Sequence, residues 1–331
     1  MTAGTSAGPT LSGSPPPSAG PPRAHPRTGG RARRSLRSDG PAGYFFLSPW
    51  ILGMVLLTLG PMLASLYLSF TDYNLFTAPE WVGLENYVDM FSDQRWRQSV
   101  LVTLTYVVLS APLKLAVALA VAMLLARPRR AQGFYRSAFY APSLIGASVS
   151  IAITWRALFS DDAAVDRVLT AIGFPSGGWV GDPSRALMIL VLLAVWQFGA
   201  PMVIFLAGLQ QIPRELYEAA ECDGAGAWRK FWSITLPTLS PVIFFNVLME
   251  TIGAFQAFTS AFVVSSGNGL GGPAGSTLFY TLYLYERGFQ DFRMGYASAM
   301  AWMLLLAVGL VTAVLFRTSR SWVFYNDGSN S

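Results

Sequence analysis

The chain has 331 residues, of which 53% are hydrophobic and only 12% are charged. A soluble domain carries about 25% charged residues, so the composition excludes an ordinary soluble protein and indicates a membrane protein. The net charge of +5 comes almost wholly from arginines, whose placement orients a membrane chain, and we expect no binding of nucleic acid.

The chain has a single cysteine, Cys222, and a single histidine, His25. They offer no disulfide, no metal pair and no imidazole base in the apolar region, so we expect no metal site and no enzymatic activity.

The first 43 residues are dense in Pro, Gly, Ser and Arg. Such a segment has too little apolar surface to offset the entropy of ordering, so residues 1–43 are predicted to be a disordered tail. The apolar run that follows, from Tyr44 to Phe70, is longer than the core of a secretory signal. It is therefore predicted to be an uncleaved first transmembrane span.

Six apolar runs follow one another along the chain, and each reaches the length of about 20 residues that a helix needs to cross a bilayer. The predicted fold is an all-α polytopic membrane domain at residues 44–320 with six transmembrane helices, followed by a cytoplasmic tail at 321–331. Prolines at Gly60-Pro61 and Pro112 predict kinks inside the first two helices. The runs cover about 44–70, 99–126, 138–159, 184–208, 238–264 and 295–316.

Arginine and lysine concentrate on the cytoplasmic side of membrane proteins. The arginines of the tail, of residues 127–137 and of residues 317–320 predict that these three segments, and hence both termini, are cytoplasmic. The segments 72–98 and 160–183 fall on the outer side in this scheme and are rich in acids. The alternation places residues 209–237, between the fourth and fifth runs, on the cytoplasmic face.

Residues 213–237 form an unusually charged segment between two apolar runs. Immersing its charges at the bilayer centre would cost on the order of 20 kcal/mol, at about 2.5–3.5 kcal/mol each, so the segment lies outside the lipid. The pattern predicts one short helix that begins near Pro213 and is capped by Gly224, and a second that ends before Leu236-Pro237. From the residues alone the segment is either an amphipathic helix on lipid headgroups or a docking surface for a soluble protein. Its acids favour docking, because the inner leaflet is itself negative.

The same segment resembles a known family. Glu218-Ala219-Ala220, then Gly224, Ile234 and Leu236-Pro237 at their spacing are similar to the EAA signature of permease subunits of binding-protein-dependent ABC importers. The stretches WVGLENYVDMFSD (81–93), GGP before Ser276-Thr277, MGYASAMA (294–301) and SLYLSFTDYNLF (65–76) are similar to the first permease of maltose-type sugar importers. The resemblance implies that the segment docks in a groove of an ATPase subunit through Glu218, Ala219, Ala220, Asp223, Gly224, Ile234, Leu236 and Pro237.

The energy source is expected to lie in another subunit. A phosphate-binding loop of the form GxxxxGK[ST] needs a Gly-Lys pair, and neither Lys114 nor Lys230 follows a glycine. We therefore expect this chain to bind no cofactor, with ATP used by the partner subunit. Six spans are few for a complete path, so we predict a pair with a second permease in the plasma membrane. The resemblance implies an ABC ATPase dimer and an extracytoplasmic solute-binding protein as further partners, although SSGNGL (265–270) departs from the family's shorter lead-in to GGP.

A sugar path needs polar groups for hydroxyls and aromatic faces for sugar rings. Polar and aromatic residues of the third, fourth and fifth runs are candidates, although a helix-packing role is open for each of them. Gln256, Thr259 and Ser260 fall at positions i, i+3 and i+4, so they are predicted to share one face of the fifth run. The candidates are Ser143, Trp196, Gln197, Asn246, Phe255, Gln256, Thr259 and Ser260.

Two charges, Lys114 and Glu250, fall inside the second and fifth runs. Ionisable residues within a membrane are candidates for function, and these two could form a structural ion pair, serve as a gate or substrate contact, or reach the interface. The leading hypothesis is the permease of an ABC sugar importer. Its alternatives are an ion-coupled secondary carrier, which should show internal repeats and paired acids, and a membrane enzyme that uses Asp161-Asp162.

Overall fold

The computed structural model describes residues 40–126, 131–146, 148–160, 163–171, 173, 178–265 and 269–323. Most of the predicted disordered tail and most of the C-terminal tail, together with Asp161-Asp162, lie outside these residues. The chain divides into two compact units, of which the first ends at Val55 and the second begins at Leu56. The described part of the first unit consists of helix α1 (Gly40–Met54), which contains Pro49, and Val55.

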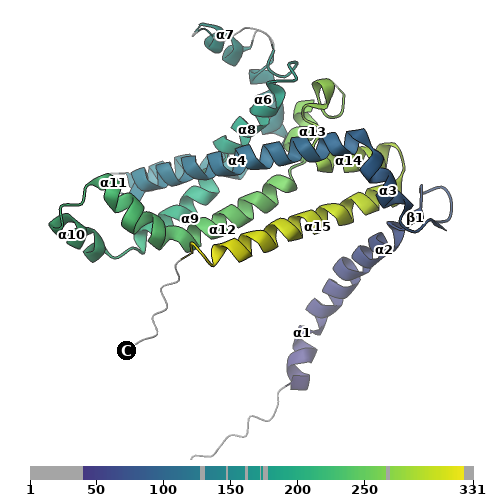
Figure 1. The fold of residues 1–331 in the computed structure, drawn as a ribbon, viewed down its shortest axis with the longest axis horizontal. Helices are drawn as coiled ribbons and strands as arrows, with labels where there is room; N and C mark the ends of the chain where they lie inside the picture. The colour runs from purple at the N-terminus through teal and green to yellow at the C-terminus, as the bar shows by residue number, and fades with distance from the viewer. Residues whose placement is uncertain are drawn as a thin grey trace, which may run out of the picture. The chain divides into compact units, whose positions relative to one another are not determined.

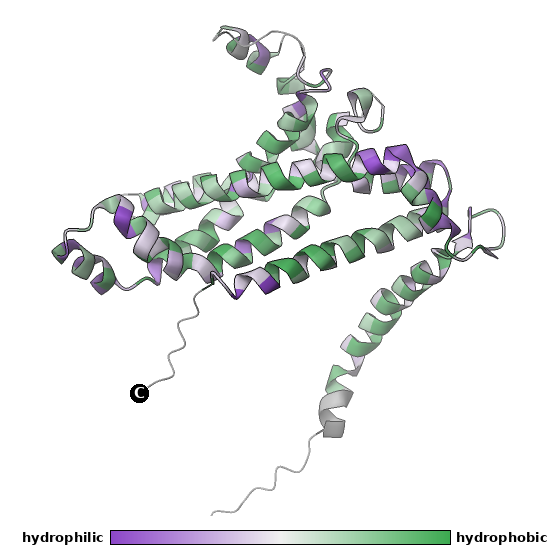
Figure 2. Cartoon of the chain, viewed as in Figure 1, coloured by the Kyte–Doolittle hydropathy of each residue, from purple (hydrophilic) through white to green (hydrophobic). Residues whose placement is uncertain are grey.

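The helices of the second unit form a bundle. Helices α4 (Gln94–Ala126), α9 (Gly199–Gln210) and α12 (Leu236–Phe255) contact one another, and α12 also contacts α15 (Met294–Ser319). Figure 1 shows α4, α12 and α15 running alongside one another. Hydrophobic residues follow most of the length of these helices, and hydrophilic residues gather near their ends (Figure 2). This pattern is typical of helices that cross a membrane.

The number of spans agrees with the prediction only if two bent pairs are each counted once. Four helices among the described residues are long and apolar enough to cross: Phe46–Leu68, Gln94–Ala126, Ala227–Phe255 and Met294–Ser319. Helices α5 (Gln132–Ile145) and α6 (Val149–Leu158) form one further candidate, bent by 97°. Helices α8 (Ala186–Trp196) and α9 form the other, bent by 42°. The third and fourth runs are therefore broken helices.

The fifth run differs from the prediction at both ends. A separate short helix before Leu236-Pro237 was expected, but one continuous helix runs from Ala227 to Phe255. Within it, α11 (Ala227–Lys230) passes through a π-helical turn, η2 (Phe231–Thr235), into α12, and Pro237 falls in the first turn of α12. Because proline lacks an N–H group and crowds the carbonyl four residues earlier, the wider turn lets the helix continue through it.

At its other end the fifth run stops at Phe255, and α13 (Thr259–Ser265) is a separate helix that packs against α6. Gln256, Thr259 and Ser260 therefore do not share a face of one helix, and that prediction is wrong. The remaining helices are short: η1 (Val55–Leu59), α2 (Gly60–Leu68), α3 (Glu85–Ser92), α7 (Ala164–Ala171), α10 (Arg214–Cys222), η3 (Pro273–Gly275), α14 (Tyr280–Tyr285) and η4 (Glu286–Gln290).

The fold is not purely α-helical. Two short antiparallel strands, β1 (Thr71–Asp72) and β2 (Glu80–Trp81), pair Thr71 with Trp81 and Asp72 with Glu80. This small hairpin falls in a segment that the sequence predicts only as an outer connection. Asn86 on α3 donates hydrogen bonds from its buried amide to the carbonyls of Ser69 and Thr71, at 3.0 and 2.9 Å, and so ties the hairpin to the helices.

A polar cluster surrounds Asp93, at the start of α4. Its carboxylate accepts hydrogen bonds from the hydroxyls of Tyr283 and Tyr296, the second at 3.0 Å, and Arg287 Nη2 lies 3.4 Å from Asp93 Oδ2. Burial raises the pKa of this carboxyl, but the hydrogen bonds from the two tyrosines and from nearby backbone N–H groups outweigh burial and leave the pKa below its ordinary value. The cluster joins α4 to α14, η4 and α15.

Candidate functional site

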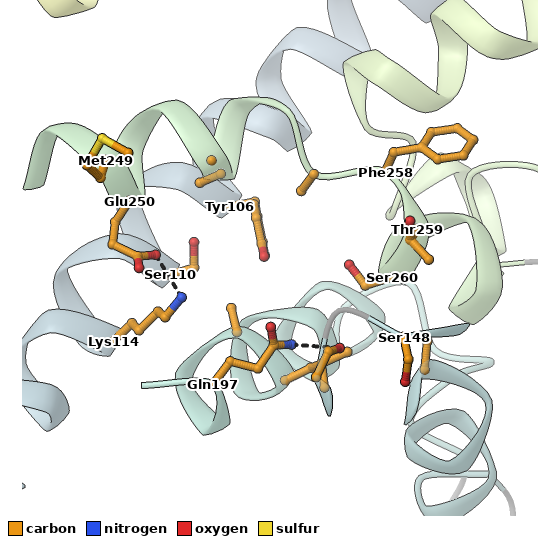
Figure 3. A pocket seen from close by; sticks show the side chains of 17 residues that line it. Tyr106, Ser110, Lys114, Ser148, Gln197, Met249, Glu250, Phe258, Thr259 and Ser260 are labelled. Carbon is orange, nitrogen blue, oxygen red and sulfur yellow. Dashed lines mark hydrogen bonds and ion pairs between the residues drawn. The ribbon is translucent and has the colours of Figure 1, made fainter. Parts of the chain in front are cut away.

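A cavity of about 370 Å³ opens between α4, α6, α8 and α12. Its wall carries the side chains that Figure 3 shows pointing toward a common space, among them Tyr106, Ser110, Gln197 and Ser260. Hydroxyl, amide and aromatic groups thus meet inside an otherwise apolar bundle. The lining residues are Tyr106, Ser110, Lys114, Gly146, Ser148, Ala152, Leu193, Ala194, Gln197, Met249, Glu250, Gly253, Ala254, Ala257, Phe258, Thr259 and Ser260.

Three helix breaks meet at this cavity. The lining includes Gly146 and Ser148 from the break between α5 and α6, Gln197 from the break between α8 and α9, and Ala257 and Phe258 from the break between α12 and α13. Backbone that leaves a helix at membrane depth exposes polar N–H and C=O groups. Such backbone is tolerated where it is buried in protein or lines a water-filled cavity. The breaks therefore place residues outside regular helix in the wall of the cavity.

Ser143 and Gln197 hold two of these breaks together. Ser143 Oγ donates to the Gln197 carbonyl at 2.9 Å and accepts from the Ala200 N–H at 3.0 Å, while Gln197 Nε2 donates to the Gly146 carbonyl at 3.2 Å. The hydrogen bonds satisfy backbone groups that the breaks leave free. Ser143 thus has a packing role and does not line the cavity, whereas Gln197 both packs and lines it.

The ion pair, one of the three possibilities that the sequence left open for these charges, is present in the structure. Lys114 Nζ on α4 lies 2.8 Å from Glu250 Oε2 on α12, and the side chains are 15% and 22% exposed. Figure 3 shows the pair at one side of the cavity, beside Ser110. Their opposite charges compensate each other, which a partly buried charge requires. The two residues therefore pair with each other and also line the cavity.

Of the other predicted path residues, Thr259 and Ser260 line the cavity from the start of α13. Four do not line it. Trp196 packs on Trp155 with ring centroids 5.6 Å apart, Asn246 is buried and donates to the Val242 carbonyl at 3.0 Å, Phe255 is buried, and Gln256 is exposed after the end of α12.

Sequence reasoning missed Tyr106, Ser110 and Ser148 as lining residues. Ser110 lies one turn and Tyr106 about two turns before Lys114 on α4, so the three share one stripe of the helix. The helical spacing of Tyr106 and Ser110 from the intramembrane Lys114 could have identified both residues from the sequence. Ser148 caps α6 by accepting from the Ile151 N–H at 3.3 Å, and no apolar periodicity announces that break.

The charged segment between the fourth and fifth runs forms a second candidate site. Helix α10 covers Arg214–Cys222, and Gly224 follows it with a φ of +75°, in the left-handed region that glycine adopts without strain. The predicted capping role of Gly224 is therefore confirmed. Pro213 precedes the helix as its N-cap residue and not as its first helical residue. Lys230 Nζ lies 2.7 Å from Glu221 Oε1, and this ion pair ties the start of the long helix to α10.

The residues of the EAA-like signature are accessible to different degrees. Glu218, Ala219, Asp223 and Gly224 are exposed, and Ala220, Ile234, Leu236 and Pro237 are partly buried. A neighbouring hollow of about 230 Å³ is lined by Ala220, Asp223, Ala225, Arg229, Lys230, Ser233 and Ile234. Ala220 and Asp223 from the first half of the signature and Ile234 from the second thus line one hollow.

The chain is similar to known proteins over most of its length. Residues 90–321 match the family model described as "Binding-protein-dependent transport system inner membrane component". The probable ABC transporter permease protein YesP of Bacillus subtilis is 50% identical over 296 residues, covering 89% of this chain and 95% of that protein. The lactose transport system permease protein LacF of Rhizobium radiobacter is 32% identical and covers 84% of this chain and 94% of that protein.

The fold also matches a solved structure. A chain of the bacterial alginate ABC transporter, solved in complex with an alginate pentasaccharide-bound periplasmic protein, superposes with a TM-score of 0.72. The match covers 84% of this chain and 94% of that chain. The sequence identity is 20%, so this likeness concerns the fold alone.

Proposed function

Because the chain belongs to the family of binding-protein-dependent transport system inner membrane components, we propose that it is the transmembrane permease subunit of an ABC importer that carries a sugar across the plasma membrane. Relatives named for transport of lactose, starch degradation products and arabinooligosaccharides support a mono- or oligosaccharide substrate. The family match favours this function over an ion-coupled secondary carrier and over a membrane enzyme.

The observation that carries the substrate assignment is the cavity at the three helix breaks. It offers the hydroxyls of Ser110, Thr259 and Ser260, the amide of Gln197 and the ring of Tyr106, which are groups that hydrogen-bond sugar hydroxyls or pack on sugar rings. Its volume of about 370 Å³ lies within the range of about 300–1,000 Å³ that is usual for small-molecule sites. The cavity is the proposed segment of the translocation path in this chain.

The coupling to ATP is proposed to pass through α10. Its exposed signature residues, Glu218 and Ala219, are available to a cytoplasmic ATPase dimer. Two contacts join α10 to the helix that continues to the cavity: the Lys230–Glu221 ion pair at 2.7 Å, and the hydrogen bond between the Tyr217 and Thr235 hydroxyls at 2.9 Å. A displacement of α10 is thereby transmitted to α12, which carries Glu250 and Gly253 in the cavity wall.

The proposed assembly contains a second permease, the ATPase dimer and an extracytoplasmic solute-binding protein. The cavity of this chain is small and is walled by one bundle, which supports a path completed by a second permease. The proposed topology places both termini and α10 in the cytoplasm. The arginine distribution along the sequence supports this orientation.

Reconstitution tests the function. The chain would be incorporated into proteoliposomes with a second permease, an ATPase and a solute-binding protein from the same organism, and uptake of radiolabelled oligosaccharides would be measured with and without ATP. We expect uptake of at least one oligosaccharide that needs ATP and all four components. Uptake driven by an ion gradient without the ATPase would contradict the proposal.

A further inference from the structure

A second large cavity, of about 860 Å³, opens at one end of the bundle. Its wall comes from the last turns of α4 and α9, from α10, and from the first turns of the helix that begins at Ala227. Three long helices thus end or begin at this cavity. Its lining residues are Met123, Ala126, Leu209, Gln210, Ile212, Arg214, Tyr217, Ala227, Trp228, Lys230, Phe231 and Thr235.

The charges of this lining are all positive. Arg214 and Lys230 line the cavity, and its lining includes no Asp or Glu, although α10 carries three glutamates. Lys230 is compensated by Glu221, at 2.7 Å. Arg214 makes no ion pair with any residue that the structure describes. The cavity therefore presents one exposed guanidinium that pairs with no described carboxylate, and its planar set of donors matches the oxygens of a phosphate.

Other residues of the lining are apolar and aromatic. Trp228 is 74% exposed and stacks on Phe231 with ring centroids 5.9 Å apart, and Met123 and Leu209 complete the apolar wall. Trp232, next to them, is 53% exposed. Tryptophans gather at the level of the lipid headgroups in membrane proteins. A large exposed tryptophan where a long apolar helix begins indicates that this end of the bundle meets the membrane–water interface.

We propose that this cavity binds one anionic phospholipid, with its phosphate at Arg214 and its glycerol and upper acyl chains along Trp228 and Phe231. The single unpaired charge of Arg214 matches the single charge of phosphatidylglycerol, and basic pockets between helices on the cytoplasmic side bind headgroups of anionic lipids. The proposal rests on the proposed orientation of α10 toward the cytoplasm. The signature residues Glu218 and Ala219 do not line the cavity, so a lipid and an ATPase can occupy the segment together.

The bound lipid gives α10 a contact with the membrane that is independent of the ATPase. Arg214 and Tyr217 face the cavity from α10, and Lys230 and Thr235 face it from the helix to which α10 is tied. A lipid in the cavity touches both sides of this connection. The lipid is therefore positioned to influence how firmly α10 is held against the start of the fifth helix.

Lipid titration of the purified full chain in detergent tests the site. Short-chain dihexanoyl phosphatidylglycerol, dihexanoyl phosphatidylcholine and inorganic phosphate would each be titrated while the midpoint of thermal unfolding is followed. We expect phosphatidylglycerol alone to raise the midpoint, saturably and by a few °C. Arg214→Gln should weaken the apparent affinity for phosphatidylglycerol about tenfold.

Arg229→Gln is the matched control, because Arg229 lines the neighbouring hollow and not this cavity. Its affinity for phosphatidylglycerol should equal that of the unmodified chain. The proposal is overturned if phosphatidylcholine or inorganic phosphate gives the same shift as phosphatidylglycerol, or if the two arginine variants weaken the affinity equally.

A second measurement detects the lipid's acyl chains beside Trp228 directly. Phosphatidylglycerol brominated on its acyl chains should quench tryptophan fluorescence more in the unmodified chain than in Trp228→Phe, and Arg214→Gln should remove that difference. Equal quenching in the unmodified chain and in Trp228→Phe would overturn the proposal. None of these measurements needs the ATPase, the second permease or a sugar. A failure here is thus distinguishable from a failure of the proposed transport function.

Discussion

Lys114 Nζ on α4 lies 2.8 Å from Glu250 Oε2 on α12, and both side chains line the cavity at which three helices break. The pair joins the second and fifth apolar runs at the proposed sugar path. Breaking a partly buried ion pair by removing one partner leaves an uncompensated charge, which costs about 3–5 kcal/mol when the site is fully buried. Because the two side chains are 15% and 22% exposed, we expect a smaller cost here.

Exchange of the two charges tests the pair. Lys114→Met and Glu250→Gln should each abolish most of the ATP-driven uptake, because each leaves one charge without a partner. The double variant Lys114→Glu, Glu250→Lys restores a pair across the same two helices and should recover part of the uptake. Proteoliposome uptake measures both results. A double variant no more active than the single ones would show that the pair does more than hold the helices together.

The close approach of α5 and α9 depends on Gly199. A Cβ atom at this position would lie 2.6 Å from the Phe139 carbonyl oxygen and 2.8 Å from Tyr140 Cα, which are backbone atoms that cannot rotate away. Gly199→Ala should destabilise the chain by about 1–3 kcal/mol, seen as a lower unfolding temperature in detergent. Gly253→Ala is the control, because a Cβ atom there meets nothing within 4 Å. Equal effects of the two variants would refute the close packing.

The turn after α10 depends on backbone conformation at Gly224. Its φ is +75°, whereas Gly226 has a φ of −68°, and a Cβ atom at either position meets nothing within 4 Å. Gly224→Ala should therefore cost about 1–2 kcal/mol of local stability and reduce the fraction of ATPase that copurifies with the permease. Gly226→Ala should leave copurification unchanged. If both variants retain the ATPase equally, the geometry of this turn is not needed for docking.

The lowered pKa of the Asp93 carboxyl predicts that the stability of the fold depends on pH. Hydrogen bonds from Tyr283 and Tyr296 outweigh its burial and lower the pKa of its carboxyl below the ordinary 3.8. A lowered folded-state pKa means that the carboxylate stabilises the fold above that ordinary value, and that the contribution is lost as the pH falls through the lower folded-state pKa. Asp93→Asn should therefore unfold at a lower temperature than the unmodified chain at pH 7, and the gap should narrow below pH 3.8. A gap that stays constant down to pH 3 would contradict this role.

The long apolar helices were predictable because their composition requires burial in lipid or protein. The runs that became α4 and α15 correspond closely to the observed helices, and the capping role of Gly224 followed from its place after a run of helix formers. The family was predictable for a different reason, since the spacing from Glu218 to Pro237 is long and specific.

The breaks in the third, fourth and fifth runs were not predictable, because they depend on tertiary contacts and not on local propensity. Ser143 and Gln197 satisfy the backbone at two of the breaks from separate helices, a contact that no local pattern encodes. The continuity of the helix through Pro237 was missed because the prediction relied on local propensity, by which a proline ends a helix. The wide turn at Phe231–Thr235 accommodates a residue that normally ends a helix. Most residues of the candidate path could therefore not be identified from the sequence.

Cross-linking from Cys222 tests the coupling claim most directly. Cys222 is the chain's single cysteine and lies exposed at the end of α10, so it can be labelled without removing another thiol. A benzophenone attached to Cys222 in the reconstituted importer should form, on illumination, an adduct with the ATPase subunit, and Glu218→Arg should greatly reduce both the adduct and the uptake. A fully active importer in which this label never reaches the ATPase would contradict the account.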